Sequence, residues 1–212
     1  MERKYEFTNE TIEFDGHKLH RIRALRDIPR HGVKAGELGG WVEDEKNLSQ
    51  EGDCWIGDEA CVIEAAHVRV AAIVRNSAVI RDSASILGTA VVEEHVIVGG
   101  EAIVGEDALV RGYAVVRGYA VVIDSAHIGG GALVETLRDY VFLRNFWSSG
   151  RGITYTRSDD TWRTGCFSGT TDELLAKAAE DSEKKRRCFE ILVRFVRDMQ
   201  EAQAIEEKHD EQ

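Results

Sequence analysis

Residues 72–104 read AIVRNSAVIRDSASILGTAVVEEHVIVGGEAIV, and this stretch decides the fold. A small residue recurs at every sixth position, Val or Ile follows two positions later, and the register extends from residue 60 to residue 134. Twelve of the thirteen small positions are Ala, and all thirteen partners are Val or Ile. The small positions are Ala60, Ala66, Ala72, Ala78, Ala84, Ala90, Val96, Ala102, Ala108, Ala114, Ala120, Ala126 and Ala132. The partners are Val62, Val68, Val74, Ile80, Ile86, Val92, Val98, Val104, Val110, Val116, Val122, Ile128 and Val134.

A period of six is neither helical nor that of a plain alternating strand. Because the two members of each pair lie two residues apart, both face one side of a short extended segment, and a bend must follow. Such a unit cannot bury its apolar face alone, so the units must stack into a solenoid. Three units close one triangular coil, with Val or Ile inside and Ala at the tight corners. The register also takes in Cys54 with Ile56 and, more weakly, Leu48. This predicts about five coils spaced about 4.8 Å apart, in a prism about 25 Å long.

The order of an aliphatic residue, two variable residues and a small residue resembles the signature of the hexapeptide-repeat superfamily. The resemblance implies a left-handed parallel β-helix, and the handedness rests on the resemblance alone. We therefore expect a mainly β protein: a left-handed parallel β-helix with an N-terminal β-hairpin cap and, after it, small antiparallel strands and an α-helix. The expected segments are 1–41 for the hairpin and capping segment, 42–135 for the β-helix, 136–169 for the antiparallel cap and 170–212 for the helical segment.

The N-terminal segment has the pattern of a hairpin over residues 4–25. Alternating apolar residues flank Asp15-Gly16, a dipeptide typical of two-residue turns. The stretch GELGGWVEDEKNLSQEG, residues 36–52, then leads into the repeat. We expect its Trp41 and Leu48 to plug the open end of the first coil, whose edge strand would otherwise offer unpaired amides.

After residue 135 the period ends, and ordinary strands are predicted near 140–146, 152–157 and 161–167. Their aromatic residues would form a small cap on the last coil: Tyr140, Phe142, Phe146, Trp147, Tyr155, Trp162 and Phe167. Thr170 to Glu173 is a capping-box pattern that starts a helix. Farther on, a heptad spacing predicts the packing face of that helix: Cys188, Leu192, Phe195, Met199 and Ala202.

The net charge of −11 belongs almost entirely to the repeat, since residues 42–135 alone carry −10. Direct nucleic-acid binding by this surface is disfavoured, because phosphate contacts require clustered Lys and Arg. The acids could imitate a phosphate array or bind a basic partner. Alternatively, they keep a repeat protein soluble and discourage end-to-end stacking.

The sequence has no apolar stretch of 18 residues and no signal peptide, which predicts a cytoplasmic protein without membrane contact, in the host cytoplasm if the chain is of phage origin. The cysteines, Cys54, Cys61, Cys166 and Cys188, lack the Cys-x-x-Cys spacing and are interpreted as reduced core thiols. The histidines of the repeat, His67, His95 and His127, fall on different faces and coils. We therefore expect no metal and no cofactor.

Positions 18 residues apart stack in columns, so the outer surface can be read from the sequence. The first face presents Cys61, Val79, Ile97, Val115 and Leu133, and the third presents Ile73, Val91, Leu109 and His127. Apolar stripes of this length are usually covered. Two unlike apolar faces suit a ring of three copies, and the superfamily resemblance also implies trimers. The predicted interface of a homotrimer consists of Val79, Ile97, Val115, Ile73, Val91 and Leu109. The alternative is that the terminal hairpin or helix covers one stripe.

Several polar residues gather in columns beside the first face and form a candidate ligand site: Arg81, His95, Tyr113, Arg117 and Tyr119. An arginine, an imidazole and two phenols around a gap at Gly99 could hold a small anionic or nucleotide-like ligand between protomers. They are equally well explained as solvated corners. On the third face, Arg75, Glu93 and Arg111 predict a charge ladder with a structural role.

A second resemblance covers most of the chain. Residues 36–52, GRGITYTR at 150–157 and TWRTGCFSGT at 161–170 are similar to a group of uncharacterised bacteriophage and prophage proteins. This implies a phage origin. The favoured hypothesis is a non-catalytic oligomeric binding protein, a counter-defence inhibitor that blocks a host defence protein or sequesters a nucleotide signal. The first alternative is a hexapeptide-repeat acyltransferase, which the superfamily resemblance implies would use His95 as general base. Against it, no inserted loop breaks the register to build a substrate pocket. The second alternative is a structural component of the phage.

Overall fold

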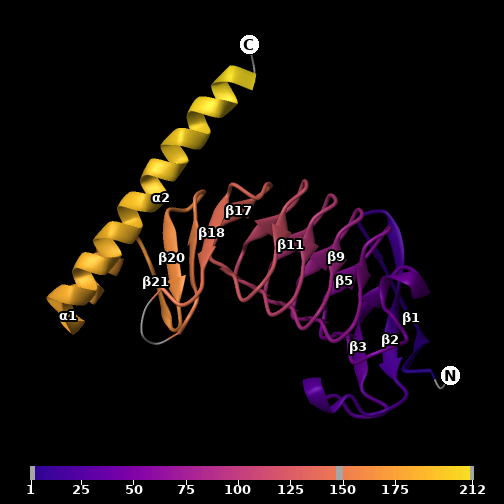
Figure 1. Cartoon of the computed structure of the whole chain (residues 1–212). Coiled ribbons are helices and arrows are strands. Elements are labelled where there is room, and N and C mark those ends of the chain that lie inside the picture. Colours follow the sequence, from indigo (N-terminus) through magenta and orange to yellow (C-terminus); the bar gives the residue numbers. More distant parts are fainter. Residues whose placement is uncertain (1–2, 147–149, 211–212) are drawn as a thin grey trace.

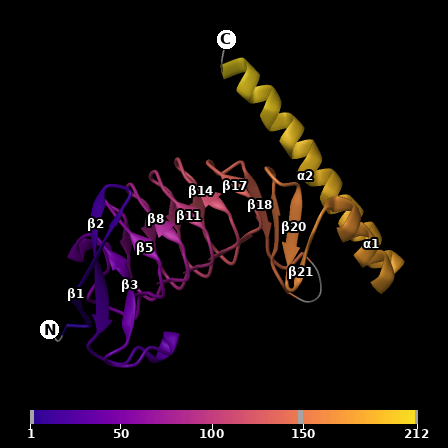
Figure 2. The same cartoon turned by 180° about the vertical axis from the view of Figure 1, so that it is seen from behind.

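Each hexapeptide of the repeat forms a two-residue strand and a corner, and the coils stack into a prism (Figures 1 and 2). The computed structural model describes residues 3–146 and 150–210, with side chains up to residue 203. The strands of the prism are β4 (Trp55–Ile56), β5 (Cys61–Val62), β6 (His67–Val68), β7 (Ile73–Val74), β8 (Val79–Ile80), β9 (Ser85–Ile86), β10 (Val91–Val92), β11 (Ile97–Val98), β12 (Ile103–Val104), β13 (Leu109–Val110), β14 (Val115–Val116), β15 (Val121–Val122), β16 (His127–Ile128) and β17 (Leu133–Val134).

These strands pair in parallel with their counterparts one coil away. The first face stacks as β5-β8-β11-β14-β17, the second as β6-β9-β12-β15 and the third as β4-β7-β10-β13-β16. In each pair the partners are 18 residues apart, as Val91 and Leu109 illustrate. The second residue of every strand and the small residue two positions before it are fully buried in one continuous core. The predicted mainly β fold, a parallel β-helix of about five coils, is confirmed.

The corners of the prism follow a second period that hydrophobicity does not reveal. Every sixth residue from Asp58 to Gly130 has a left-handed backbone, with φ between +53° and +81°. Gly, Asp and Asn, which tolerate this conformation best, occupy nine of these thirteen described corners. Val70, with φ of +64°, is the β-branched exception.

Side chains at the corners also connect successive coils. The Asn76 side-chain oxygen accepts the N–H of Glu94 at 3.1 Å, and the Glu94 carboxylate accepts the N–H of Gly112 at 2.7 Å. The carboxylates of Glu64, Asp82 and Glu106 accept corner N–H groups in the same way. Part of the acidic character of the prism is therefore structural, a role that neither sequence-based interpretation of the charge anticipated.

The N-terminal hairpin closes one end of the first sheet. It consists of β1 (Tyr5–Phe14) and β2 (His17–Ala24), joined by Asp15 and Gly16 with φ of +50° and +82°, as a two-residue hairpin turn requires. Strand β2 pairs antiparallel with β3 (Leu38–Val42), which pairs in parallel with β5. Short 3-10 turns follow at Pro29–His31 and Glu45–Asn47. The predicted hairpin is confirmed, and it protects the edge that the first coil would expose.

The prediction that Trp41 plugs the open end is wrong. Val42 takes the inward position of β3, so its neighbour Trp41 points outward and lies beside Cys61 in a small cluster with Leu19. Leu48 does lie in the main core, and Tyr5 and Ile22 join it there.

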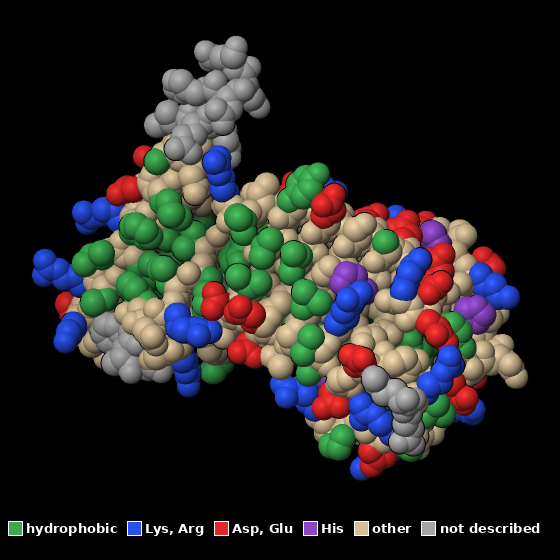
Figure 3. All heavy atoms as spheres, turned by 45° about the vertical axis from the view of Figure 1, so that its right-hand side comes forward, with side chains coloured by type: hydrophobic (Ala, Val, Ile, Leu, Met, Phe, Trp, Pro, Cys, Tyr) green, Lys and Arg blue, Asp and Glu red, His purple; other side chains and the backbone are tan. Residues whose placement is uncertain are grey.

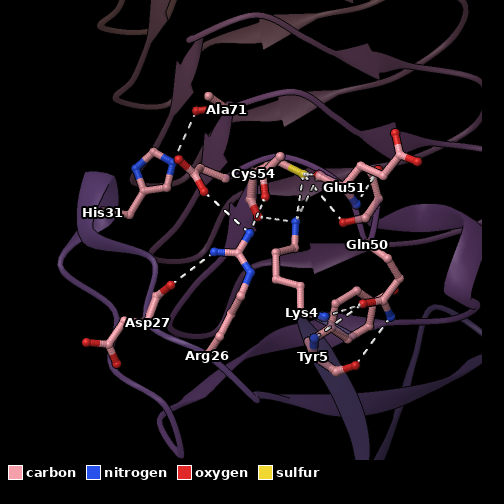
Figure 4. A network of polar contacts seen from close by, with 12 residues as sticks. Lys4, Tyr5, Arg26, Asp27, His31, Gln50, Glu51, Cys54 and Ala71 are labelled. Carbon is pink, nitrogen blue, oxygen red and sulfur yellow. Dashed lines mark hydrogen bonds and ion pairs between the residues drawn. The ribbon is translucent and has the colours of Figure 1, made fainter. Parts of the chain in front are cut away.

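A buried polar network anchors the hairpin to the first coil (Figure 4). The Lys4 ammonium donates to the carbonyl oxygen of Cys54 at 2.8 Å and lies 3.1 Å from the Cys54 sulfur. Burial lowers the pKa of Lys4. The Gln50 side-chain oxygen accepts the Lys4 N–H at 2.8 Å, and the Tyr5 hydroxyl donates to the Leu48 carbonyl at 2.8 Å. Because each of these donors has an acceptor, the network explains how a lysine next to the N-terminus is fully buried.

At the other end, a small antiparallel sheet lies between the last coil and the helices. Its strands are β18 (Tyr140–Leu143), β19 (Ile153–Thr156), β20 (Thr161–Thr164) and β21 (Phe167–Gly169). On β18, Tyr140 and Phe142 pack against the core of the prism, whereas Val141 and Leu143 pack toward the helices. The predicted cap is confirmed, although β21 was not predicted, the strands are shorter than expected, and Trp147 lies outside the described residues.

Two helices complete the chain, α1 (Thr171–Asp181) and α2 (Glu183–Asp210). Thr170 caps α1 in the predicted capping box with Glu173, while the break at Ser182 was not predicted. The buried face of α2 consists of Phe189, Leu192, Val193 and Val196. The predicted heptad face is therefore wrong in part, since Phe195 is 52% exposed. The described helices include none with the length and apolar character needed to span a bilayer.

Candidate functional site

The first face of the prism presents the apolar row that the sequence predicts. Val79, Val115 and Leu133 are partly exposed, and Ile97 is 42% exposed. The hairpin covers only the start of this row, where Cys61 is buried beside Leu19. All three predicted interface residues of this face, Val79, Ile97 and Val115, are thus at least partly accessible to a partner.

The third face is more covered than the first. Val91 and Leu109 are partly exposed, but Ile73 is buried. The segment between β2 and β3 closes over this region, since Ile28 and Val33 join the buried cluster around Trp55, which is paired with Ile73. Ile73 therefore does not offer the accessible surface that its place in the predicted interface requires.

His95 and Tyr113 lie at neighbouring corners along one edge of the first face. Their rings are stacked, with centroids 4.9 Å apart and an interplanar angle of 13°. Tyr113 is 70% exposed, and the imidazole of His95 is open to solvent. This pair is the part of the predicted site that the structure brings together.

Arg81 and Arg117 lie along the opposite edge of the same face, each paired with a carboxylate. Arg81 contacts Asp15 of the hairpin turn at 3.0 Å, and Arg117 contacts Glu135 at 2.7 Å. Between them, Gly99 leaves room for Arg81, because a Cβ atom there would lie 3.2 Å from the Arg81 Cγ. Tyr119, at the corner after Arg117, is 74% exposed. Both guanidinium groups are therefore partly neutralised, which weakens them as anion ligands.

The five predicted site residues thus form two groups, separated by the row that contains Ile97 and Val115. Within one chain they do not enclose a single pocket. A ligand that contacts both groups would have to lie across the apolar row, or a second copy would have to supply the missing wall.

Of the other histidines in the repeat, His67 lies on the second face in β6 and His127 on the third face in β16. The described residues contain no cluster of His, Cys, Asp or Glu able to hold a metal ion. Burial, together with Arg111 and Arg163, lowers the pKa of His127 to about 4, and its Nε2 atom has no hydrogen-bond partner. The Glu43 carboxylate accepts a hydrogen bond from the His17 ring, and this contact raises the pKa of His17. On the third face, the Arg75 guanidinium lies 2.5 Å from the Glu93 carboxylate. Among the described residues, this is the one ion pair of the predicted charge ladder that forms.

Two of the four cysteines are not the core thiols that the sequence predicts. Cys54 and Cys61 are buried thiols, but Cys188 is half-buried and Cys166 is exposed, so neither of these two is a core residue.

No protein-family model matches the chain. An alignment of 68 positions, which covers 28% of the chain, is 40% identical to a protein of Escherichia coli (strain K12) named "uncharacterized acetyltransferase YdcK". The chain spans 20% of the length of that protein. This similarity and the parallel solenoid fit a β-helix superfamily of the hexapeptide-repeat kind. The resemblance to phage proteins stays a prediction.

Proposed function

We propose that the protein is an acyltransferase that moves an acyl group from a thioester to a hydroxyl or amine, with His95 as general base. The 40% identity to a protein named an acetyltransferase carries this proposal. It favours the acyltransferase over the phage counter-defence hypothesis, for which no comparable observation exists. Of the repeat histidines, His95 is the most accessible, whereas His127 and His67 are partly covered.

The proposed reaction needs one group that takes a proton and one that holds this group in position. The His95 imidazole takes the proton of the acceptor hydroxyl or amine as its oxygen or nitrogen attacks the thioester carbonyl. A C–O or C–N bond forms, the C–S bond breaks, and the proton passes to the departing thiolate. The stacked ring of Tyr113 holds the imidazole plane in place.

A second copy of the chain completes this site in our proposal. His95 and Tyr113 stand at the edge of an apolar row that is partly exposed in a single chain. A neighbour packed on Val79, Ile97 and Val115 would wall a cleft beside them and exclude water. This accounts for the lack of an inserted loop, since the partner takes the place of a pocket built by the same chain.

The test uses acetyl-coenzyme A as donor with a panel of hydroxyl and amine acceptors, and the release of free thiol is measured. We expect turnover with at least one acceptor class and a loss of about 100-fold or more in His95→Asn. His67→Asn, on the second face, is the matched control and should keep full activity. The proposal is wrong if the wild-type protein neither binds nor turns over acetyl-coenzyme A, or if His95→Asn is as active as the control.

A second candidate function is non-catalytic binding of a nucleotide-like ligand or a host protein. The exposure of Tyr113 and Tyr119 favours it, because exposed aromatic residues beside arginines are typical of stacking and docking surfaces. This is the counter-defence hypothesis in its testable form. A native mass measurement of protein purified from its host, which retains bound ligands, distinguishes the two: a copurified nucleotide without thioester turnover supports binding.

A further inference from the structure

A cavity of about 560 Å³ lies between the antiparallel cap and the helices, at the opposite end of the chain from the hairpin. Its walls come from β19, β20, β21, α1 and α2, and half of the described lining residues are apolar: Phe146, Ile153, Phe167, Leu174, Ala178 and Phe189. On the side of the molecule seen in Figure 3, hydrophobic side chains gather toward the C-terminal end, whereas charged side chains dominate toward the hairpin. The volume is in the range of sites for small organic ligands.

Three basic residues lie around this cavity, and they differ in their partners. Lys177 pairs with Glu180 at 2.6 Å, and Lys185 pairs with Asp181. Among the described residues, no carboxylate pairs with Arg151. The Arg151 side chain instead lies against the backbone of Gly165, where a Cβ atom would come within 2.7 Å of Nη1. Within the described part of the chain, the cavity thus has one exposed guanidinium that no carboxylate pairs with, in a protein whose net charge is −11.

We propose that this cavity binds an amphipathic monocarboxylate, with the apolar body against the aromatic walls and the carboxylate on Arg151. A guanidinium binds a carboxylate through two parallel hydrogen bonds, which gives both affinity and orientation. A neutral apolar ligand would leave the guanidinium unmatched. A multiply charged phosphate ligand would need further cations, but Lys177 and Lys185 are already paired with carboxylates. The site is separate from His95, so it does not depend on the proposed acyl transfer.

The exposed thiol of Cys166 gives a direct readout, because Cys166 lines the cavity and Cys188 does not. Decanoate is the probe, below its micelle concentration, and alkylation of each cysteine by iodoacetamide is followed by peptide mass spectrometry. We expect saturating decanoate to slow alkylation of Cys166 about tenfold and to leave Cys188 unchanged. Decanol, which has the same chain without the charge, should protect Cys166 only at about tenfold higher concentration.

Arg151→Gln tests the charge contact, and because Arg151 is exposed the variant should fold. We expect it to need about tenfold more decanoate for the same protection, with decanol unaffected. Arg187→Gln, on the exposed surface of α2, is the matched control and should behave as the wild type. The proposal is overturned if decanoate fails to protect Cys166, or if Arg151→Gln binds decanoate as the wild type does. It is also overturned if Cys166 is protected without ligand in a dimer that dilution dissociates, since a second copy then occupies the cavity.

Discussion

At the scale of single residues, the corners decide how the coils join. The left-handed positions fall two residues before the buried small residues, and all of them except Val70 are occupied by Gly or by polar residues. A hydrophobicity pattern cannot distinguish them from solvent-exposed positions. Their role becomes visible only when backbone angles and the hydrogen bonds between coils are known, as at Asn76 and Glu94.

Val70 is the corner residue whose type fits its backbone least. A β-branched side chain with φ of +64° is strained, and 58% of this one is exposed, so little packing is lost on replacement. We expect Val70→Asn to raise the free energy of unfolding by about 1 kcal/mol, measured by urea denaturation. At the corresponding corner of the next coil, Gly88→Val should lower the free energy of unfolding by more than about 1 kcal/mol. A Cβ atom at Gly88 would lie 2.6 Å from the Glu106 nitrogen. Equal stability of the two variants would contradict this account.

His127 should make the protein less stable in mild acid. Its pKa is about 4 in the folded protein against an ordinary value of 6.5, so below pH 6.5 the unfolded chain binds a proton that the folded protein does not. We expect the free energy of unfolding to fall by about 2 kcal/mol between pH 7.5 and pH 5 on account of this group. Arg111 and Arg163 reinforce the effect, and Glu93 opposes it.

The measurement compares urea denaturation at the two pH values in wild type and His127→Leu, which continues the aliphatic column of Leu109. The variant should lose about 2 kcal/mol of the pH dependence, the part that His127 contributes. His95→Asn, which removes an exposed imidazole, should retain it. If the free energy of unfolding of His127→Leu depends on pH as strongly as that of the wild type, the burial of this ring does not cause the pH dependence.

At the scale of elements, the ends of the prism illustrate what a sequence pattern leaves undetermined. The hairpin was predictable, because alternation and the Asp15-Gly16 turn are local signals. The packing face of α2 was not, because several apolar faces coexist on that helix and the cap selects among them. Val193 and Val196 pack on the cap, whereas Phe195 and Ile191 are exposed.

This difference can be measured with a matched pair of truncations on α2. We expect Leu192→Ala, which empties a buried position, to lower the free energy of unfolding by about 2–4 kcal/mol. Phe195→Ala removes more atoms from an exposed position and should change it by less than about 0.5 kcal/mol. Both are read from urea denaturation of the full chain. The predicted heptad face requires similar losses of stability in the two variants. Similar losses would therefore contradict the packing described above.

At the scale of the whole molecule, the most consequential feature is the accessible apolar row on the first face of the prism. The hairpin reaches only its beginning, so Ile97 and the aliphatic residues around it stay accessible in a single chain. The proposed homotrimer uses this face, and the second face with its mixed residues offers the natural control.

We expect native mass spectrometry to report three copies for the wild type and one for Ile97→Arg, because a buried unpaired charge is costly at an interface. Ile103→Arg places the same charge at the equivalent position of the second face and should leave the assembly intact. A wild-type monomer, or an Ile97→Arg variant that still assembles, would exclude the first face as the interface.

The prism as a whole was predictable because its contacts obey one rule: residues 18 apart lie side by side, so neighbours such as Ile97 and Val115 follow from counting. The candidate site could be predicted only as columns. Counting places His95 beside Tyr113, but it does not show that Arg81 and Arg117 pair with Asp15 and Glu135. The cavity in the cap was not predicted at all, because its walls come from three strands and two helices whose mutual packing follows no repeat.

The coil period also has a consequence for how such a chain can change in length. The hairpin continues the first face, while the cap contacts the third through β16. Insertion or loss of three hexapeptides would lengthen or shorten the shaft and leave these two ends facing as before. Insertion of a single hexapeptide would instead turn the cap and its helices by one face about the long axis, about a third of a revolution, without disturbing the interior. The relative orientation of the hairpin and the cap therefore stays the same only when the number of hexapeptides changes by a multiple of three.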